Sequence, residues 1–400
     1  MTSAVQPAGD ARTSVVFQLI PFSLAAFLGF LAIGVPLPVL PGYINHTLGF
    51  GPVVVGLVIG LQSLVTLLTR QYAGQLCDRR GPKRASLAGL GLASLSGLLY
   101  LASSACAAQP LVALAILVCG RLVLGLAESL FITALAAWSI ARVGHQHAGR
   151  AMAWSGIAMY GALAIGAPLG TVAAHAGGFP AAAACAVLLP GLGALLAWRW
   201  TDAPLGTGHR ASFLSVLRLI WAPGLAMALA SSGIGVIVTF LALRYQTQGW
   251  TGAGFALTGF GVAYIGVRLV LGHLPDRVGG YRTAIVCLLI EAAALLLIWQ
   301  ARSGAMALAG ATLTGLGYSL VFPSLGVEAI RRVGPERRGL ALGAYLACFD
   351  LGLAMAGPVA GVVAQAAGLA STFVAGAVAA VLAMTLLAVT LFRQRQVGGG

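Results

Sequence analysis

The sequence predicts an all-α integral membrane protein in which twelve transmembrane helices form two pseudo-symmetric six-helix bundles, with both termini cytoplasmic. Three observations support this prediction. Hydrophobic residues make up 59% of the chain, against roughly 45–50% in soluble proteins. Apolar stretches of about 20 residues, the length at which a helix crosses a bilayer, recur throughout. One charged, glycine-containing segment also occurs twice, first from Arg70 and again from Arg268.

Glycine, proline and charge clusters separate the apolar stretches and so mark the expected ends of the helices. The twelve spans are expected near residues 17–40, 53–74, 86–106, 111–139, 151–172, 180–199, 222–244, 253–273, 283–300, 305–329, 339–362 and 369–392. The one long connection divides them six and six. We therefore expect an N-terminal bundle at 1–200, a cytoplasmic linker at 201–221 and a C-terminal bundle at 222–400.

The net charge of +14 would suit a nucleic-acid-binding protein, but the positions of the charges argue against that class. With these spans, all but five of the 23 basic residues fall on one side of the membrane. The exceptions are Arg244 and Arg302 on the other side, and Arg70, Arg121 and Arg268 within spans. This asymmetry is the positive-inside pattern, which places both termini in the cytoplasm. The expected partner is the lipid bilayer, and no nucleic acid.

Enzyme and cofactor motifs are absent from the sequence. The six cysteines have no metal-ligand spacing, and there is no nucleophile elbow, phosphate-binding loop or HExxH pattern. We therefore expect no catalytic residue, no metal and no cofactor. Without an ATP site, an ion gradient or the substrate's own gradient must supply the energy.

The duplicated segment predicts a pair of equivalent loops at the cytoplasmic face. Its glycines suit close approach and a tight turn, and its aspartates can accept hydrogen bonds from a neighbouring helix or basic side chain. We expect the two loops to form a latch between the bundles, although the arginines could simply anchor the topology. Arg70 and Arg268, one turn earlier, are expected to extend toward the cytoplasm, with a packed polar role as the alternative. The latch residues are Gly74, Asp78, Arg79, Gly81, Arg84, Gly272, Asp276, Arg277, Gly279 and Arg282.

Two further repeats support the duplication. Residues 125–130 match 315–320, and small residues of the fifth span recur in the eleventh. Repeats that keep one orientation form two halves related by an axis along the membrane normal. The small residues are expected to pack helices closely. They are Gly161, Gly166, Pro168 and Gly170, with Gly352, Gly357, Pro358 and Gly361.

These motifs resemble those of the major facilitator superfamily. The loop from Gly74 to Arg84 is similar to its signature loop, and Arg121 with Gly125 to its second motif. The segment 161–170 resembles the fifth-helix motif of its proton-coupled antiporters, with Ala167 as an extra residue. Residues 40–43, 228–240 and 319–323 resemble the YhhS and YfcJ branch of bacterial proton-coupled efflux transporters. The resemblance implies the major facilitator fold, a multi-pass location in the bacterial inner membrane and a role for Arg121 in proton coupling.

Arg121 and Glu128 have no charged counterpart in the repeat, where Ala311 and Tyr318 stand instead. Seven residues are nearly two helical turns, so both charges share one face about 10 Å apart. A charge at the bilayer centre costs at least about 2.5–3.5 kcal/mol, so such residues mark a pathway or a buried pair. We interpret them as proton-coupling residues; a structural ion pair is the alternative.

Asp350, halfway along the eleventh span, is our preferred proton carrier, with Glu128 second. Burial favours the protonated form of a carboxyl group, which a reversible carrier needs. Asp350 could instead contact a cationic substrate or be a satisfied buried acid. The resemblance implies a peripheral place for the ninth span, where Glu291 could pack against a neighbouring helix or lie near lipid as a protonated acid. Weaker candidates for a substrate cavity, for each of which packing is the favoured interpretation when it is taken alone, are Gln62, Trp154, Tyr160, Ser231, Tyr318 and Tyr345.

The sequence thus predicts a secondary transporter that exports a small organic molecule in exchange for protons by alternating access, functional as a monomer. A gradient-driven facilitator or importer of a metabolite such as a sugar is the alternative. A membrane receptor or membrane-embedded enzyme is a more distant one. The charges leave the substrate open, because the acids favour cations and Arg121 favours anions.

Overall fold

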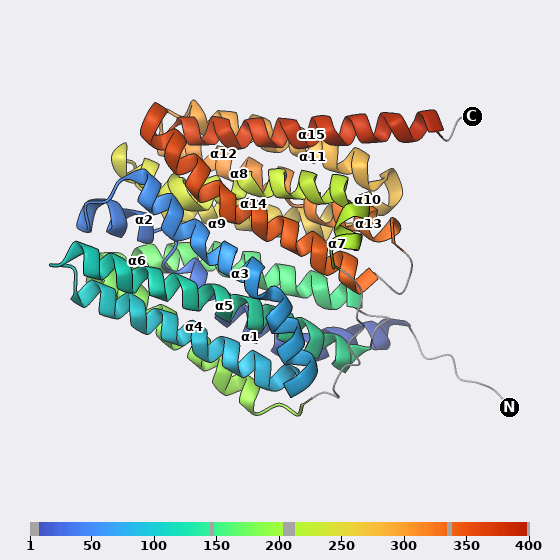
Figure 1. Ribbon diagram of the computed structural model, residues 1–400, viewed down its shortest axis with the longest axis horizontal. Coiled ribbons are helices and arrows are strands. Elements are labelled where there is room, and N and C mark those ends of the chain that lie inside the picture. The colour runs from blue at the N-terminus through green and yellow to red at the C-terminus, as the bar shows by residue number, and fades with distance from the viewer. Residues whose placement is uncertain (1–7, 145–147, 203–212, 334–337, 398–400) are drawn as a thin grey trace.

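The computed structural model describes residues 8–144, 148–202, 213–333 and 338–397, and these form helices joined by short connections (Figure 1). The helices of the first half are α1 (Ala8–Gly34), α2 (Leu40–Gly42), the π-helix η1 (Tyr43–Thr47), α3 (Pro52–Arg80), α4 (Pro82–Ala105), α5 (Pro110–Val143) and α6 (Ala148–Trp198). Those of the second half are α7 (Phe213–Leu219), α8 (Trp221–Thr247), α9 (Ala253–Leu271), α10 (Leu274–Val278), α11 (Gly280–Trp299), α12 (Gly304–Tyr318), α13 (Val321–Arg331), α14 (Arg338–Ala367) and α15 (Ser371–Val397).

Among the described residues, eleven helices are long and apolar enough to cross a membrane. One of them, α6, has 51 residues and leaves helical geometry at Gly177 and Gly178, so its two parts coincide with the predicted fifth and sixth spans. The count of twelve spans and the cytoplasmic position of the termini stay predictions. Residues 203–212, most of the predicted linker, lie outside the described part.

Proline and glycine set several helix ends. Helices α3, α4 and α5 each begin at a proline, whose missing N–H costs nothing in a first turn. Gly81 and Gly279 follow α3 and α10 with φ values of 86° and 101°, which favour glycine. The predicted tenth span is divided into α12 and α13, because Pro323 cannot donate to the carbonyl of Ser319.

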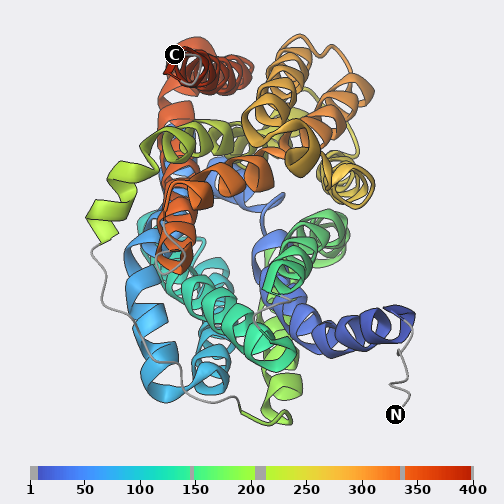
Figure 2. The ribbon, with the colours of Figure 1, turned by 90° about the vertical axis from the view of Figure 1, so that its right-hand side faces the viewer.

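The two halves lie side by side. In Figure 1, α1, α4 and α5 occupy the lower part and α11, α12 and α15 the upper part, and Figure 2 shows the same division. Helix α3 packs along α14, and α6 along α9. Helix α1 begins and α15 ends at the same end of the molecule (Figure 1). We call this the termini end, and the opposite one, with residues 248–252, the far end.

Backbone contacts close the far end between the halves. A Cβ atom on Gly56 would overlap the carbonyl oxygen of Gly357, and one on Gly361 would lie 2.9 Å from the carbonyl oxygen of Pro52. On the other interface, a Cβ on Gly254 would lie 3.0 Å from the Cα of Pro168. Glycine is therefore required where α3 meets α14 and where α9 meets α6. The halves are locked together from the middle of the bundle to the far end.

Candidate functional site

An ion pair joins the two halves between α3 and α14. The Nε atom of Arg70 donates to Oδ2 of Asp350 at 2.8 Å, and Nη2 contacts the same oxygen. Asp350 is 3% exposed. Arg70 therefore has the packed polar role and does not extend toward the termini end. Its guanidinium turns to the other half because the buried carboxylate supplies a charged acceptor there. A buried pair of this kind is costly to break from either side.

Glu128 on α5 is held by two side chains of α3. Its Oε2 atom accepts hydrogen bonds from Nε2 of Gln62 at 2.9 Å and from Oγ1 of Thr66 at 3.1 Å. Gln62 and Thr66 are both buried. The carboxyl group thus faces the same helix, α3, that carries Arg70.

Arg121 has its own partners and does not pair with Glu128. Its guanidinium donates to the carbonyl oxygens of Val58 at 3.2 Å and Ile59 at 2.9 Å, and to the hydroxyl of Tyr100 at 3.4 Å. Arg121 is 2% exposed and so connects α5 to α3 and α4 inside the first half. The alternative of a structural Arg121–Glu128 ion pair is absent from this conformation.

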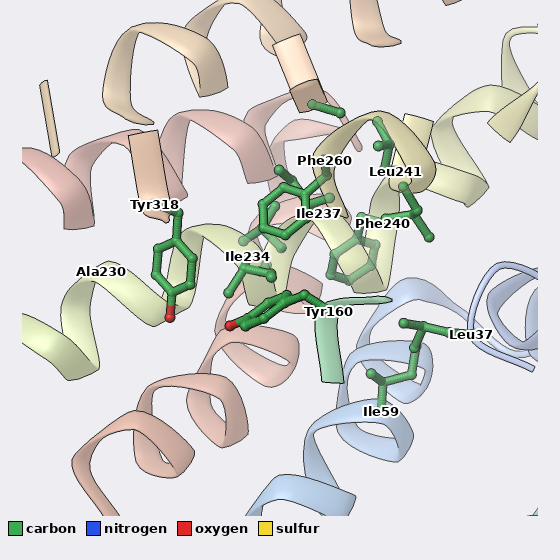
Figure 3. Close-up of a cluster of buried hydrophobic side chains, with 14 of the residues drawn as sticks. Leu37, Ile59, Tyr160, Ala230, Ile234, Ile237, Phe240, Leu241, Phe260 and Tyr318 are labelled. Carbon is green, nitrogen blue, oxygen red and sulfur yellow. The ribbon is translucent and has the colours of Figure 1, made fainter. Parts of the chain in front are cut away.

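A cavity of about 120 Å³ lies between the halves. Gln62, Arg121 and Glu128 line it from the first half, together with Tyr160 of α6. Its walls are mostly apolar, and they include Ile234 and Leu353 of the second half. Figure 3 shows Ile234 and Tyr160 side by side within this buried cluster. A few polar groups on apolar walls are typical of a small-molecule site.

The other predicted cavity residues pack elsewhere. Trp154 packs against a separate cluster that contains Val15 and Leu19. Ser231 donates to the carbonyl of Phe349 at 3.1 Å, and Tyr345 to that of Phe322 at 2.8 Å. Tyr318 is fully buried, and its hydroxyl has no hydrogen-bond partner within the described chain. Gln62 and Tyr160 are therefore the two predicted cavity residues that line the cavity.

The duplicated loops lie at the termini end. Lys83 Nζ donates to the carbonyl of Trp200 at 2.7 Å, which ties the first loop to its own half. Asp78 is exposed and makes no hydrogen bond or ion pair with the described residues. The side chain of Asp276 lies outside the described part. The remaining latch arginines are exposed; they are Arg79, Arg84, Arg277 and Arg282. Gly74 has open space around it, and Gly272 lies against the Arg268 carbonyl.

The small residues of the fifth and eleventh spans contact different helices. Gly166 faces the backbone of Gly34 at the end of α1, and Gly170 faces that of Val35 just after it, whereas Gly161 lies near the ring of Phe27. In α14, Gly352 lies against the carbonyl of Ala228 in α8, and Pro358 packs beside Gly60 of α3. The repeated glycines thus serve contacts within one half as well as between the halves.

A sequence model of the Major Facilitator Superfamily matches residues 22–253 and again 225–399. The chain belongs to this superfamily. An uncharacterized MFS-type transporter of Pseudomonas aeruginosa is 45% identical over 393 residues, which cover 98% of both chains. One from Burkholderia mallei is 43% identical over 394 residues, or 98% of this chain and 97% of that one.

Solved structures show the same fold. The nucleoside transporter NupG matches with a TM-score of 0.77 at 13% identity, over 93% of this chain and 99% of that chain. The human organic anion transporter MFSD10 matches with a TM-score of 0.67 at 19% identity, over 96% of this chain and 100% of that one. The superfamily resemblance is thus confirmed, and the chain is a membrane transporter and not an enzyme. The finer likeness to the YhhS and YfcJ branch stays a prediction.

Sequence reasoning missed two polar residues of this transporter, Arg70 as the partner of Asp350 and Thr66 as a partner of Glu128. The signal for Arg70 was its position within an apolar span. Thr66 gave a weaker signal: it lies four residues after Gln62 and so shares a helix face with it.

Glu291 of the transporter is fully buried in the second half, so it packs against neighbouring helices and does not lie beside lipid. Its carboxyl group lies against Gly233 of α8, and Gly317 of α12 packs on the backbone of α11 beside it. Neither carboxyl oxygen has a hydrogen-bond partner among the described residues. An ionised carboxylate without a partner would cost several kcal/mol here, so the neutral acid fits this environment.

Replacing Glu291 with Met is therefore expected to stabilise the protein by about 1–3 kcal/mol, because it removes a buried group without a partner and keeps the volume. Thermal unfolding of the purified protein measures the change, and Glu291→Gln is the matched polar control. Transport should be unchanged in both variants. Loss of transport in a folded Glu291→Gln protein would instead assign this carboxyl group a part in the transport cycle.

Proposed function

We propose that the transporter exports a small organic molecule across the bacterial inner membrane in exchange for protons, by alternating access. The observation that carries this proposal is the ion pair between Arg70 and Asp350, because its two members belong to different halves. A proton on Asp350 neutralises the carboxylate and removes the charge that holds Arg70. Proton occupancy thereby acts directly on a contact that must change when the halves rock.

Glu128 and Arg121 have supporting parts in this proposal. Glu128 lines the cavity and contacts α3, the helix that carries Arg70, so it is the second candidate for proton binding. Arg121 binds two carbonyl oxygens of α3 and so fixes the helix that presents Gln62 and Thr66 to Glu128. Such positioning holds a functional carboxyl group in one geometry.

In this proposal the duplicated loops act in the conformation that is open at the far end. In the present structure the far end is closed, and Asp78 is exposed without a described partner. We propose that the latch forms when the far end opens and the termini end closes. The excess of basic residues at the termini end supports a cytoplasmic position for that end.

Inverted membrane vesicles with an imposed, acidic-inside pH gradient test the exchange. A panel of small organic molecules is added, and the internal pH is followed with a pH-sensitive dye. An exported substrate is expected to enter the vesicles, release protons and raise the internal pH, and vesicles without the protein are the control. Substrate flux that never moves protons would support the gradient-driven facilitator, and flux that occurs only with protons moving in the same direction would support an importer.

A further inference from the structure

Arg268 on α9 is the repeat counterpart of Arg70 and also reaches the boundary between the halves. A Cβ atom on Gly156 of α6 would lie 2.7 Å from Nη1 of Arg268. Arg70 sits at the α3–α14 interface and Arg268 at the α6–α9 interface. The two guanidinium groups therefore occupy equivalent places on the two sides of the bundle.

The two arginines differ in their partners. Arg70 is paired with Asp350. At the offset of 191 that relates Gly161 to Gly352, that aspartate corresponds to Met159, which carries no charge. Arg268 makes no hydrogen bond or ion pair with the described residues, and its guanidinium lies 5.1 Å from the ring centre of Tyr264. At the α6–α9 interface, the guanidinium of Arg268 therefore has no negatively charged partner among the described residues.

Other buried arginines of this chain have acceptors. Arg121 donates to two carbonyl oxygens of α3, and Arg244, at the far end, donates to the carbonyls of Trp299 at 3.0 Å and Ala301 at 3.2 Å. A guanidinium has five N–H donors, and a charge within a membrane span is costly without a partner. Arg268, which is partly buried, therefore has donors to offer to an anion from outside the chain.

Tyrosines surround this position and connect it to the cavity. The ring of Tyr160, which lines the cavity, lies 3.7 Å from that of Tyr264, and the ring of Tyr318 lies 6.2 Å from Tyr264. The hydroxyl of Tyr318 is buried without a partner among the described atoms. In Figure 3 the hydroxyls of Tyr160 and Tyr318 both lie on the side away from Leu37. A phenol hydroxyl there can donate to the same anion.

We propose that Arg268 binds the carboxylate of the transported substrate, and that the substrate is a small organic carboxylate whose apolar body occupies the cavity. The apolar part of the cavity, which includes Ile33, Ile59, Ile234 and Leu353, suits such a body. This inference rests on the proposed transport function but not on its direction or its coupling to protons.

The test is ligand binding to the purified full-length protein. Each member of a panel of small monocarboxylates, among them hexanoate and benzoate, is compared with its neutral amide by thermal-shift assay and calorimetry. We expect at least one carboxylate, and not its amide, to stabilise the protein at millimolar concentration. In Arg268→Gln its Kd should rise roughly tenfold to a hundredfold, the effect of losing a charged hydrogen bond. Arg268→Lys, which keeps the charge, should bind more tightly than Arg268→Gln.

Arg302→Gln is the matched control, because it removes the same charge from an exposed position and should leave the Kd unchanged. Equal binding by wild type and Arg268→Gln would overturn the inference, and so would a panel in which no carboxylate binds better than its amide. Binding is measured on purified protein without a pH gradient, so it does not depend on proton coupling. Wild-type protein that binds the carboxylate but shows no proton-driven flux in vesicles would contradict the proposed exchange and leave this inference standing.

Discussion

Replacing Asp350 with Asn is expected to abolish the pH dependence of transport in proteoliposomes. The amide side chain of this variant cannot take up or release a proton, so the contact between α3 and α14 would no longer respond to the proton gradient. Proton-driven accumulation of the substrate should fall by at least about tenfold, which corresponds to about 1.4 kcal/mol of lost coupling. The measurement is the initial rate of flux at a series of pH values, with the substrate found in the vesicle screen.

A double variant separates coupling from stability. Removing one member of a buried ion pair destabilises a protein by about 3–5 kcal/mol, so Asp350→Asn and Arg70→Gln should each lower the unfolding temperature. The double variant should regain most of that loss and still lack pH dependence. Glu328→Gln is the control, because its partner Arg331 is 57% exposed and surface pairs contribute little. A normal pH profile in the double variant would refute the assignment of Asp350.

The candidate site could be predicted from the sequence one residue at a time but not as a set of contacts. Asp350 stood out because a carboxyl group in an apolar span needs a reason. Its partner Arg70 is 280 positions away and on the other half, so the pair depends on how the halves pack. Glu128 and Gln62 were both selected, yet their hydrogen bond follows from the approach of α5 to α3.

The fold was predicted more completely than the site, because the length and hydropathy of a segment directly indicate whether it can span a membrane. The sequence prediction did not show where helices break within the spans or run on between them. Pro323 divides the tenth span into two helices, and the backbone at Gly177 and Gly178 turns without a separate loop. Trp154 was placed in the cavity by its helix, but its face of that helix turns to the cluster of Val15 and Leu19. Membrane spans are apolar on all sides, so their helix faces differ little in sequence. The sequence therefore does not predict which face turns to the cavity.

Replacing Gly56 with Leu is expected to prevent closure of the far end and to reduce transport by at least about tenfold. A Cβ atom at this position would overlap the carbonyl oxygen of Gly357, and a helix backbone has little room to yield. Overpacking costs about 1–3 kcal/mol even where side chains can adjust, and every 1.4 kcal/mol shifts a two-state equilibrium about tenfold. The variant should therefore populate the conformation open at the far end.

Thiol labelling can measure that shift. Leu37 lines the cavity and is 5% exposed, so Leu37→Cys, in a protein whose six cysteines are replaced, reports access to the cavity. Gly56→Leu should speed its modification by a membrane-impermeant reagent applied at the far end, and slow it from the termini end. Gly91→Leu is the matched control, since that glycine is exposed with open space around it. If labelling from both sides is unchanged in a folded Gly56→Leu protein, the α3–α14 contact does not control access to the cavity.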